Sequence, residues 1–170
     1  MEKIFLKYPA KIMKIKRKLE KALDIKISKI GEEIVIEGEG MQEFEALQVL
    51  EAIDVNFHTK VALLLRDSDY ILEKINLKDY VRQSRLSTIK SRIIGTKGNT
   101  KREMSILTDC EIIINDNTVY LIGLTDDANI ASKAIRSLIK GSTHSSVYAF
   151  LEKSRRIRKE HELLGDNPSL

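Results

Sequence analysis

Residues 93–98 read Ile93-Ile94-Gly95-Thr96-Lys97-Gly98, and the apolar spacing on each side of this stretch is typical of a helix. We expect one helix over 85–94 and a second over about 99–108, with Met104 and Leu107 on one face. Because glycine has no side chain, the two glycines allow a foreign backbone to approach the turn closely. The second glycine also opens a helix, whose first N–H groups and dipole attract phosphate. The stretch therefore predicts a clamp for a phosphate backbone between two helices.

The glycine pair also allows two other interpretations. The glycines could serve only the positive φ angles of a tight turn, with no ligand. A nucleotide-binding P-loop is not supported, because Thr100 stands where that motif needs glycine and no strand precedes the turn. The local charge favours a polyanionic ligand, since residues 84–102 contain six cations and no carboxylate. These cations are Arg85, Lys90, Arg92, Lys97, Lys101 and Arg102.

The elements around this turn predict an α+β fold. Strands are expected over 110–115 and 118–124, joined at Asp116-Asn117 by a hairpin turn with positive φ. A helix capped by Thr125 should follow and end at Lys140-Gly141, and residues 70–77 alternate like a strand. A three-stranded sheet with helices on one face is the compact packing for this order. Residues 146–163 predict one more helix, which is rich in Lys and Arg.

An internal repeat extends this organisation to the first half of the chain. Residues 33–38 match residues 118–123 at an offset of 85, and other apolar positions repeat at the same offset. The first copy predicts a strand over 3–6, a basic helix over 11–23, a hairpin over 25–37 and a helix over 42–53. In that last helix we expect Phe44, Leu47, Leu50 and Ile53 to face the core. The first copy has little room for an opening helix, and residues 10–13 lack both glycines.

The repeat gives three segments: a degenerate unit over 1–66, a complete unit with its extra helix over 67–164, and a flexible tail over 165–170. Charge separates the units further, because residues 31–58 hold eight carboxylates and no Lys or Arg. A nucleic acid would be repelled from that stretch, which favours protein docking there. The basic helix over 11–23 either extends an electrostatic track or is an ordinary solvated face.

Composition excludes several classes of function. No apolar run approaches the roughly 20 residues of a membrane span, and the first residues lack the pattern of a secretory signal, so we expect a cytoplasmic protein. A single cysteine, Cys110, and three scattered histidines offer no metal-ligand spacing. Paired carboxylates or a catalytic triad at a recognisable spacing are also lacking. We expect no metal, no cofactor and no enzymatic activity.

With its flanking helices, hairpin and last helix, the stretch 93–98 resembles the glycine loop of the KH (K homology) family. The resemblance implies two tandem type I KH domains, the first degenerate, plus a C-terminal helix. It also implies that about four unpaired nucleotides lie between the 99–108 helix and the 111–114 strand. The residues expected to bind RNA are Gly95, Thr96, Lys97, Gly98, Lys101, Arg102, Arg92, Lys90, Arg85, Ile94 and Ile112.

A narrower resemblance covers nearly the whole chain. Residues 92–98, the pair Lys101-Arg102, residues 143–153 and residues 67–80 resemble archaeal relatives of the ribosome-assembly factors called partner of Nob, which are kin to the Krr-type factors. This resemblance implies a noncatalytic protein that binds the 3′ region of small-subunit ribosomal RNA. It implies as partners the Nob endonuclease and the alpha subunit of translation initiation factor two. The alternative that stays open is a protein-interaction scaffold with incidental RNA contact.

Overall fold

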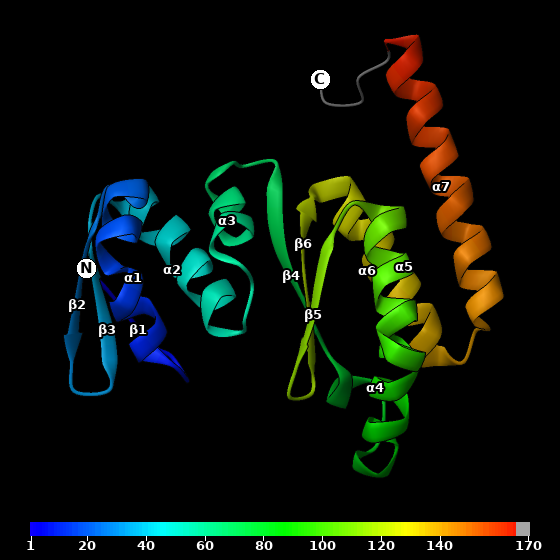
Figure 1. The fold of residues 1–170 in the computed structure, drawn as a ribbon, viewed down its shortest axis with the longest axis horizontal. Coiled ribbons are helices and arrows are strands. Elements are labelled where there is room, and N and C mark those ends of the chain that lie inside the picture. The colour runs from blue at the N-terminus through cyan, green and yellow to red at the C-terminus, as the bar shows by residue number, and fades with distance from the viewer. Residues whose placement is uncertain (166–170) are drawn as a thin grey trace. The chain divides into compact units, whose positions relative to one another are not determined.

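The computed structural model describes residues 1–165 and divides the chain into two compact units, Met1–Leu72 and Glu73–Leu170 (Figure 1). The tail expected over 165–170 falls, apart from Gly165, outside the described residues. Each unit contains its own three-stranded sheet. No helix in the described part of the chain combines the length and the apolar character needed to cross a membrane.

The first unit forms its sheet in the order β1-β3-β2, with antiparallel neighbours. Ile34 and Ile36 of the central strand are fully buried, as are Ile12 and Leu19 of the first helix. The helices and strands of this unit are β1 (Glu2–Phe5), α1 (Pro9–Leu23), β2 (Lys26–Ile30), β3 (Glu33–Glu37), α2 (Gly40–Asp54), α3 (Thr59–Ala62) and the 3-10 helix η1 (Leu63–Arg66).

The start of α1 is fixed by a carboxylate from the end of α2. Asp54 accepts hydrogen bonds from the amides of Lys7 (2.8 Å) and Tyr8 (2.7 Å), and only 8% of Asp54 is exposed. Pro9 follows as the first helical residue, where its missing N–H costs nothing. The carboxylate also lies at the positive end of the helix dipole. One of the eight acidic residues of the 31–58 stretch therefore has a structural role in the unit's interior.

The first unit has no opening helix, for which the sequence left little room. Only residues 6–8 separate β1 from α1, and residues 10–13 lie inside α1. The expectation that Phe44 faces the core is wrong, because 58% of Phe44 is exposed. The buried face of α2 instead runs through Ala46, Val49, Leu50 and Ile53, and Phe44 lies on the far side of the helix from it.

The second unit has the sheet order β4-β6-β5, which is the same sequence of first, third and second strand as in the first unit. Its strands are β4 (Tyr70–Asn76), β5 (Glu111–Asn115) and β6 (Thr118–Leu124). Its α-helices are α4 (Leu86–Ile94), α5 (Asn99–Thr108), α6 (Thr125–Lys140) and α7 (His144–Leu164), and its 3-10 helices are η2 (Leu77–Asp79), η3 (Gln83–Arg85) and η4 (Thr96–Gly98).

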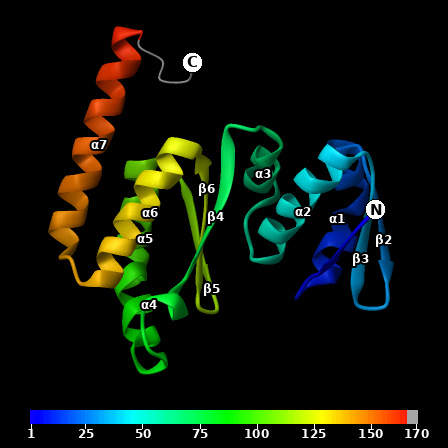
Figure 2. The same ribbon diagram turned by 180° about the vertical axis from the view of Figure 1, so that it is seen from behind.

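Helices cover one face of this second sheet. α5 and α6 pack against the sheet and against each other, and α7 packs on both of them on the side away from the strands (Figures 1 and 2). The core is built by β6 and by the face of α6 that carries Ala131, Ala134, Ile135 and Leu138, all nearly inaccessible to solvent. α7 adds only Val147 and Leu151 to the buried set.

Most of the turns follow the sequence pattern. Asp116 takes a positive φ of 52° in the β5–β6 hairpin, and Gly141 ends α6 with a φ of 108°. The expected cap of α6 is displaced: Thr125 is already the first residue of the helix, and Leu124 holds the capping position. β2, β3, β5 and β6 keep the offset of 85, since 26–30 and 33–37 become 111–115 and 118–122.

Candidate nucleic-acid interface

The turn between α4 and α5 is built from residues with left-handed backbone angles. Gly95 has a φ of 74° and a ψ of 174°, Lys97 a φ of 53°, and Gly98 a φ of 75°. The Gly95 amide donates to the Ser91 carbonyl (2.8 Å), and the Gly98 amide donates to the Gly95 carbonyl (3.2 Å). Positive φ at Lys97 is unfavourable for a side chain of this kind, and the turn keeps it because the flanking glycines and helices define the path.

The two glycines are needed for different reasons. A β-carbon on Gly95 would lie 2.2 Å from Oγ1 and 2.7 Å from the backbone nitrogen of Thr100, so Gly95 is required by packing inside the protein. A β-carbon on Gly98 would meet no atom of the described residues within 4 Å. The side of Gly98 that lacks a side chain is therefore open to an external group, and Gly98 directly precedes α5.

Cationic side chains surround this open position. Lys97 is exposed at the turn, Lys101 is half-buried one turn into α5, and Arg102 is exposed with its guanidinium donating to Oδ1 of Asn99. Thr96 is also exposed. Gly98 cannot cap α5 with a side chain, so the positive end of the helix dipole is left without a side-chain cap in a segment that also carries these cations. The arrangement suits a phosphate backbone.

Other residues expected to bind RNA lie on the preceding helix or just before it. Arg85 is exposed, Lys90 is half-buried, and 37% of the apolar residue Ile94 is exposed at the end of α4. All three are accessible, and Ile94 offers an apolar surface directly beside the glycine turn. They remain candidates for contact with phosphates or with a base.

Two of the residues expected to bind RNA, Arg92 and Ile112, make their contacts inside the protein. The Arg92 guanidinium donates to the carbonyl of Ser142, and the Arg92 carbonyl is 2.9 Å from Nε2 of His144, so Arg92 ties α4 to the start of α7. Ile112 is only 1% exposed and belongs to the core of the sheet. Neither side chain is presented at the surface of the turn, and we leave both out of the proposed RNA site.

Sequence reasoning missed the role of Thr100. It is 5% exposed and packs against Gly95, so that it fixes the first turn of α5 against the end of α4. A small β-branched residue two places after the second glycine was the available signal.

Nucleophilic and metal chemistry have little support in the second unit. Burial raises the pKa of the Cys110 thiol to about 12, so this cysteine is a protonated core residue at neutral pH. Within residues 1–165, no three side chains among His, Cys, Asp and Glu are grouped so that they could hold a metal ion.

The strand and helix order of the second unit, with its glycine turn between α4 and α5, defines a class of RNA-binding fold. The family model described as the eukaryotic type KH-domain (KH-domain type I), specific to the second such domain of PNO1 proteins, matches residues 71–156. This chain therefore belongs to the KH-domain proteins of the PNO1 type.

Named relatives and a solved structure agree with this assignment. A KH domain-containing protein of Methanocaldococcus jannaschii is 30% identical over 83% of this chain and 65% of its own length. The pre-rRNA-processing protein pno1 of Schizosaccharomyces pombe is 29% identical over 68% of this chain and 49% of its own length. The chain thus spans less than two thirds of each of these relatives.

The solved structure is that of the a/eIF2alpha–aDim2p–rRNA complex from Pyrococcus horikoshii. It matches with a TM-score of 0.81 and 27% identity, covering 91% of this chain and 93% of that one. At 91% of this chain, the similarity extends beyond the second unit into the first.

Proposed function

We propose that this protein is a noncatalytic, single-stranded RNA-binding factor of small-subunit ribosome biogenesis that acts in the cytoplasm. Its second unit holds the 3′ region of small-subunit ribosomal RNA at the glycine turn between α4 and α5. The observation that carries the proposal is the open position at Gly98, which directly precedes α5 and is flanked by Lys97, Lys101 and Arg102. The contacting residues are these four with Gly95, Thr96, Lys90, Arg85 and Ile94.

Similarity to proteins linked to ribosomal RNA supports the proposed role in ribosome biogenesis. One relative is described as a pre-rRNA-processing protein, and the Pyrococcus neighbour was solved with ribosomal RNA and the alpha subunit of initiation factor two. We extend to this chain an interaction with that alpha subunit. The association with a Nob-type endonuclease is proposed from the family resemblance alone.

We propose further that the first unit is a degenerate KH domain and that the two domains meet near residues 66–67. The shared order of first, third and second strand supports this interpretation. The first unit differs at the position that corresponds to the glycine turn. There α1 already runs through residues 10–13, and the amides just before the helix donate to the Asp54 carboxylate. It therefore lacks a glycine turn that could hold RNA in the manner proposed for the second unit.

The direct test is a pair of substitutions at Gly98. Gly98→Asp and Gly98→Asn add side chains of nearly equal size, and both residue types tolerate left-handed backbone better than most. Only Asp adds negative charge beside the proposed phosphate. We expect Gly98→Asp to weaken binding of a single-stranded 16S rRNA 3′ fragment at least tenfold, and clearly more than Gly98→Asn, with equal melting temperatures. Wild-type affinity in Gly98→Asp would refute the proposal.

Salt dependence gives a second measurement of the same site. Each single-strand phosphate that a cation neutralises contributes a slope of about −0.7 to the plot of log affinity against log salt. Replacing Lys97 and Arg102 by Ala should make the slope less steep by about 1.4 if both contact phosphates. An unchanged slope would place the phosphate contacts elsewhere.

A second candidate function, a protein-interaction scaffold with incidental RNA contact, draws on the exposed apolar residues of the first unit. Phe5 is 73% exposed and Ile30 is 62% exposed, and both lie opposite Glu33 in the sheet. Residues directly opposite one another in a sheet share a face, so these two side chains frame one exposed surface. A pull-down with and without nuclease separates the two functions, since partners retained after nuclease treatment favour the scaffold.

A further inference from the structure

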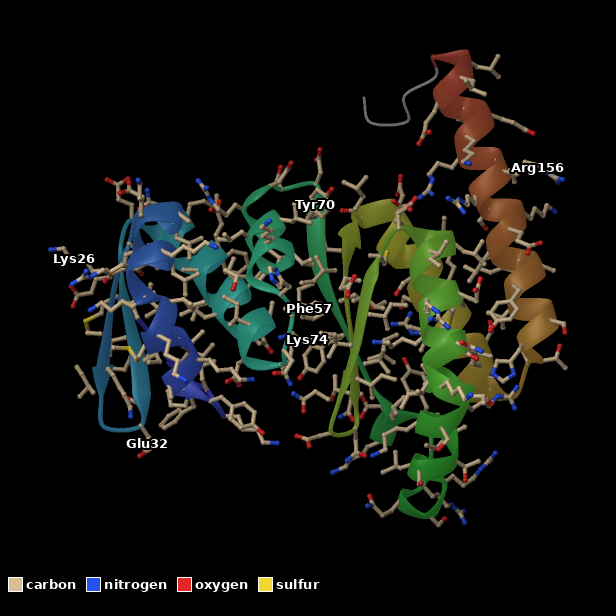
Figure 3. All side chains as sticks on the ribbon, in the orientation of Figure 1. Lys26, Glu32, Phe57, Tyr70, Lys74 and Arg156 are labelled. Atoms are coloured by element: carbon tan, nitrogen blue, oxygen red, sulfur yellow. The ribbon has the colours of Figure 1, made fainter. Side chains whose placement is uncertain are left out.

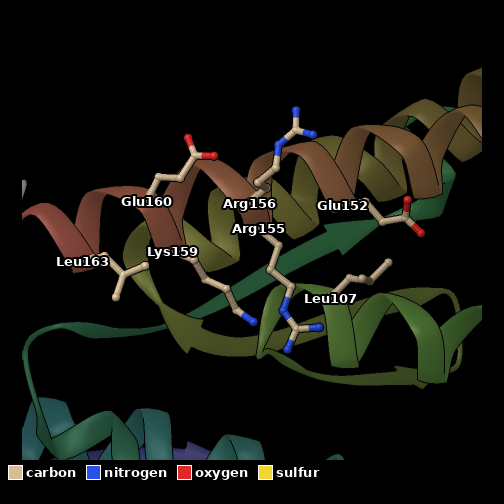
Figure 4. Close-up of a pocket in the computed structure, with 7 residues that line it drawn as sticks. All are labelled: Leu107, Glu152, Arg155, Arg156, Lys159, Glu160 and Leu163. Atoms are coloured by element: carbon tan, nitrogen blue, oxygen red, sulfur yellow. The ribbon is translucent and has the colours of Figure 1, made fainter.

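A hollow of about 330 Å³ lies between α5 and α7, outside the glycine turn (Figure 4). α7 contributes six side chains. They follow one another at intervals of three residues or one, which places them on one stripe along the helix. α5 contributes Leu107. The residues of α7 are Glu152, Arg155, Arg156, Lys159, Glu160 and Leu163.

The side chains of this stripe separate by direction. Arg155, Lys159 and Leu163 extend from α7 toward the side of α5 and Leu107, whereas Glu160 and Arg156 extend the opposite way (Figure 4). Figure 3 also shows Arg156 projecting away from the body of the unit. The side of the hollow toward α5 therefore carries two cations, Arg155 and Lys159, together with apolar Leu107 and Leu163. Glu152 also lines the hollow, and Glu160 lines it while extending the opposite way.

Two groups of this stripe are unsatisfied or uncovered within the described part of the chain. The buried Nε of Arg155 has no hydrogen-bond partner among residues 1–165. Leu163, at the other end of the stripe, is 87% exposed. The apolar surface of Leu163 beside these cations is therefore open to a partner.

The wall of the hollow is held in place from behind. Arg158, between Arg155 and Leu163 in sequence, donates to Asp127 of α6 and to Asp109 at the end of α5, the second at 2.6 Å. Leu151 and Val147 of α7 are buried against the same helices. The stripe is therefore presented on a helix anchored by an ion-pair network and by apolar packing.

We propose that this hollow, which we call the α5–α7 hollow, is a docking site for an acidic amphipathic helix of a partner protein. Arg155 and Lys159 are four residues apart, so carboxylates at the same spacing on a facing helix match them in charge and distance. Apolar side chains of that helix cover Leu107 and Leu163. RNA phosphates would pair with the cations but would leave the two leucines uncovered, and the apolar part of the hollow therefore favours a protein segment.

The experiment uses the full chain with a photo-reactive benzoylphenylalanine in place of Leu163, irradiated in nuclease-treated extract of the cells that make the protein. The cross-linked peptide is then sequenced. We expect a segment with acidic residues spaced three or four apart among apolar ones. The double variant Arg155→Glu/Lys159→Glu should reduce the cross-link at least tenfold. Lys153→Glu, a charge reversal at an exposed residue of the same helix that does not line the hollow, should leave it within twofold.

Several results would overturn this proposal. They are a cross-link to RNA, a cross-link to a second copy of the chain, a captured peptide without acidic residues, equal loss in the Lys153→Glu control, and no cross-link at all. RNA binding by Gly98→Asp and by the double variant distinguishes this site from the glycine turn. The double variant should keep wild-type affinity for a short RNA fragment if the two sites are separate.

Discussion

Gly95 and Thr100 approach so closely that a β-carbon on residue 95 would fall 2.2 Å from the Thr100 hydroxyl oxygen. Five residues apart in sequence, they lock the end of α4 against the first turn of α5. Gly98 stands between them with its vacant side toward open space. One glycine of the motif thus shapes the turn, and the other leaves room for what the turn binds.

This difference predicts unequal costs for alanine at the two glycines. Gly95→Ala combines a collision with Thr100 and backbone angles that only glycine adopts readily, and we expect a loss of about 2 to 5 kcal/mol in the free energy of unfolding. Gly98→Ala meets no neighbour and should lose about 1 kcal/mol for its positive φ. Denaturant unfolding of both variants checks this, and equal losses would contradict it.

Asp54 should be essential to the first unit. Asp54→Ala removes the acceptor of two amides just before α1, which we expect to cost about 1 to 3 kcal/mol. Hydrogen exchange should speed up at Lys7 and Tyr8. The control is Glu32→Ala at the exposed tip of the β2–β3 hairpin (Figure 3), which should change stability by less than about 0.5 kcal/mol. Unchanged exchange at Lys7 and Tyr8 in Asp54→Ala would show that the carboxylate is dispensable.

Part of the fold could be predicted from the sequence alone. The β5–β6 hairpin and the C-terminal end of α6 were predictable because Asp116 and Gly141 belong to types that accept positive φ, and local chemistry decides such turns. Phe44 was misplaced because α2 has apolar residues on more than one face. Only the packing of α2 against α1 and β3 selects which of them is buried.

The site was predictable to a similar extent. The glycines and Lys97, Lys101 and Arg102 cluster as expected because they are neighbours along the turn and one helix. The contact of Arg92 could not be predicted, because its partner, the Ser142 carbonyl, is 50 residues away and depends on where α7 starts. The burial of Ile112 could not be predicted either, because an apolar strand residue has two possible faces, and the helix packing decides which is covered.

Arg158 should hold α7 to the rest of the second unit. Arg158→Ala leaves Asp127, which is 5% exposed, without its cationic partner. We expect a loss of about 2 to 4 kcal/mol, below the full cost of a buried pair because 24% of the Arg158 side chain is exposed. Arg156→Ala, an exposed position on the same helix, should stay within about 0.5 kcal/mol of wild type. A similar effect of both variants would remove the basis for this anchor.

The same carboxylate predicts a pH dependence. Burial raises the pKa of Asp127 above its ordinary value, although Arg158 opposes the shift. The folded protein then holds the Asp127 proton more tightly than the unfolded chain does. Asp127 therefore contributes its full stabilisation below the unfolded pKa of about 3.9, and this contribution is lost as the pH rises through the folded pKa.

The matched variant is Asp127→Asn, which does not titrate. The free energy of unfolding of the wild type minus that of Asp127→Asn should fall as the pH rises through the folded pKa of Asp127. The other carboxylates are common to both proteins, so their titration largely cancels. Unfolding curves over a pH series measure the difference, and a difference that stays constant or rises would contradict the predicted direction.

The most direct test of the RNA site is a titration of the isotope-labelled full chain with a short single-stranded RNA, followed by the backbone amide signals. We expect the largest shifts at Gly95, Thr96, Lys97, Gly98, Lys101 and Arg102, and little change at Arg92 and Ile112. Signals that move elsewhere in the chain while residues 95–102 stay unperturbed would contradict the proposal that RNA is held at this turn.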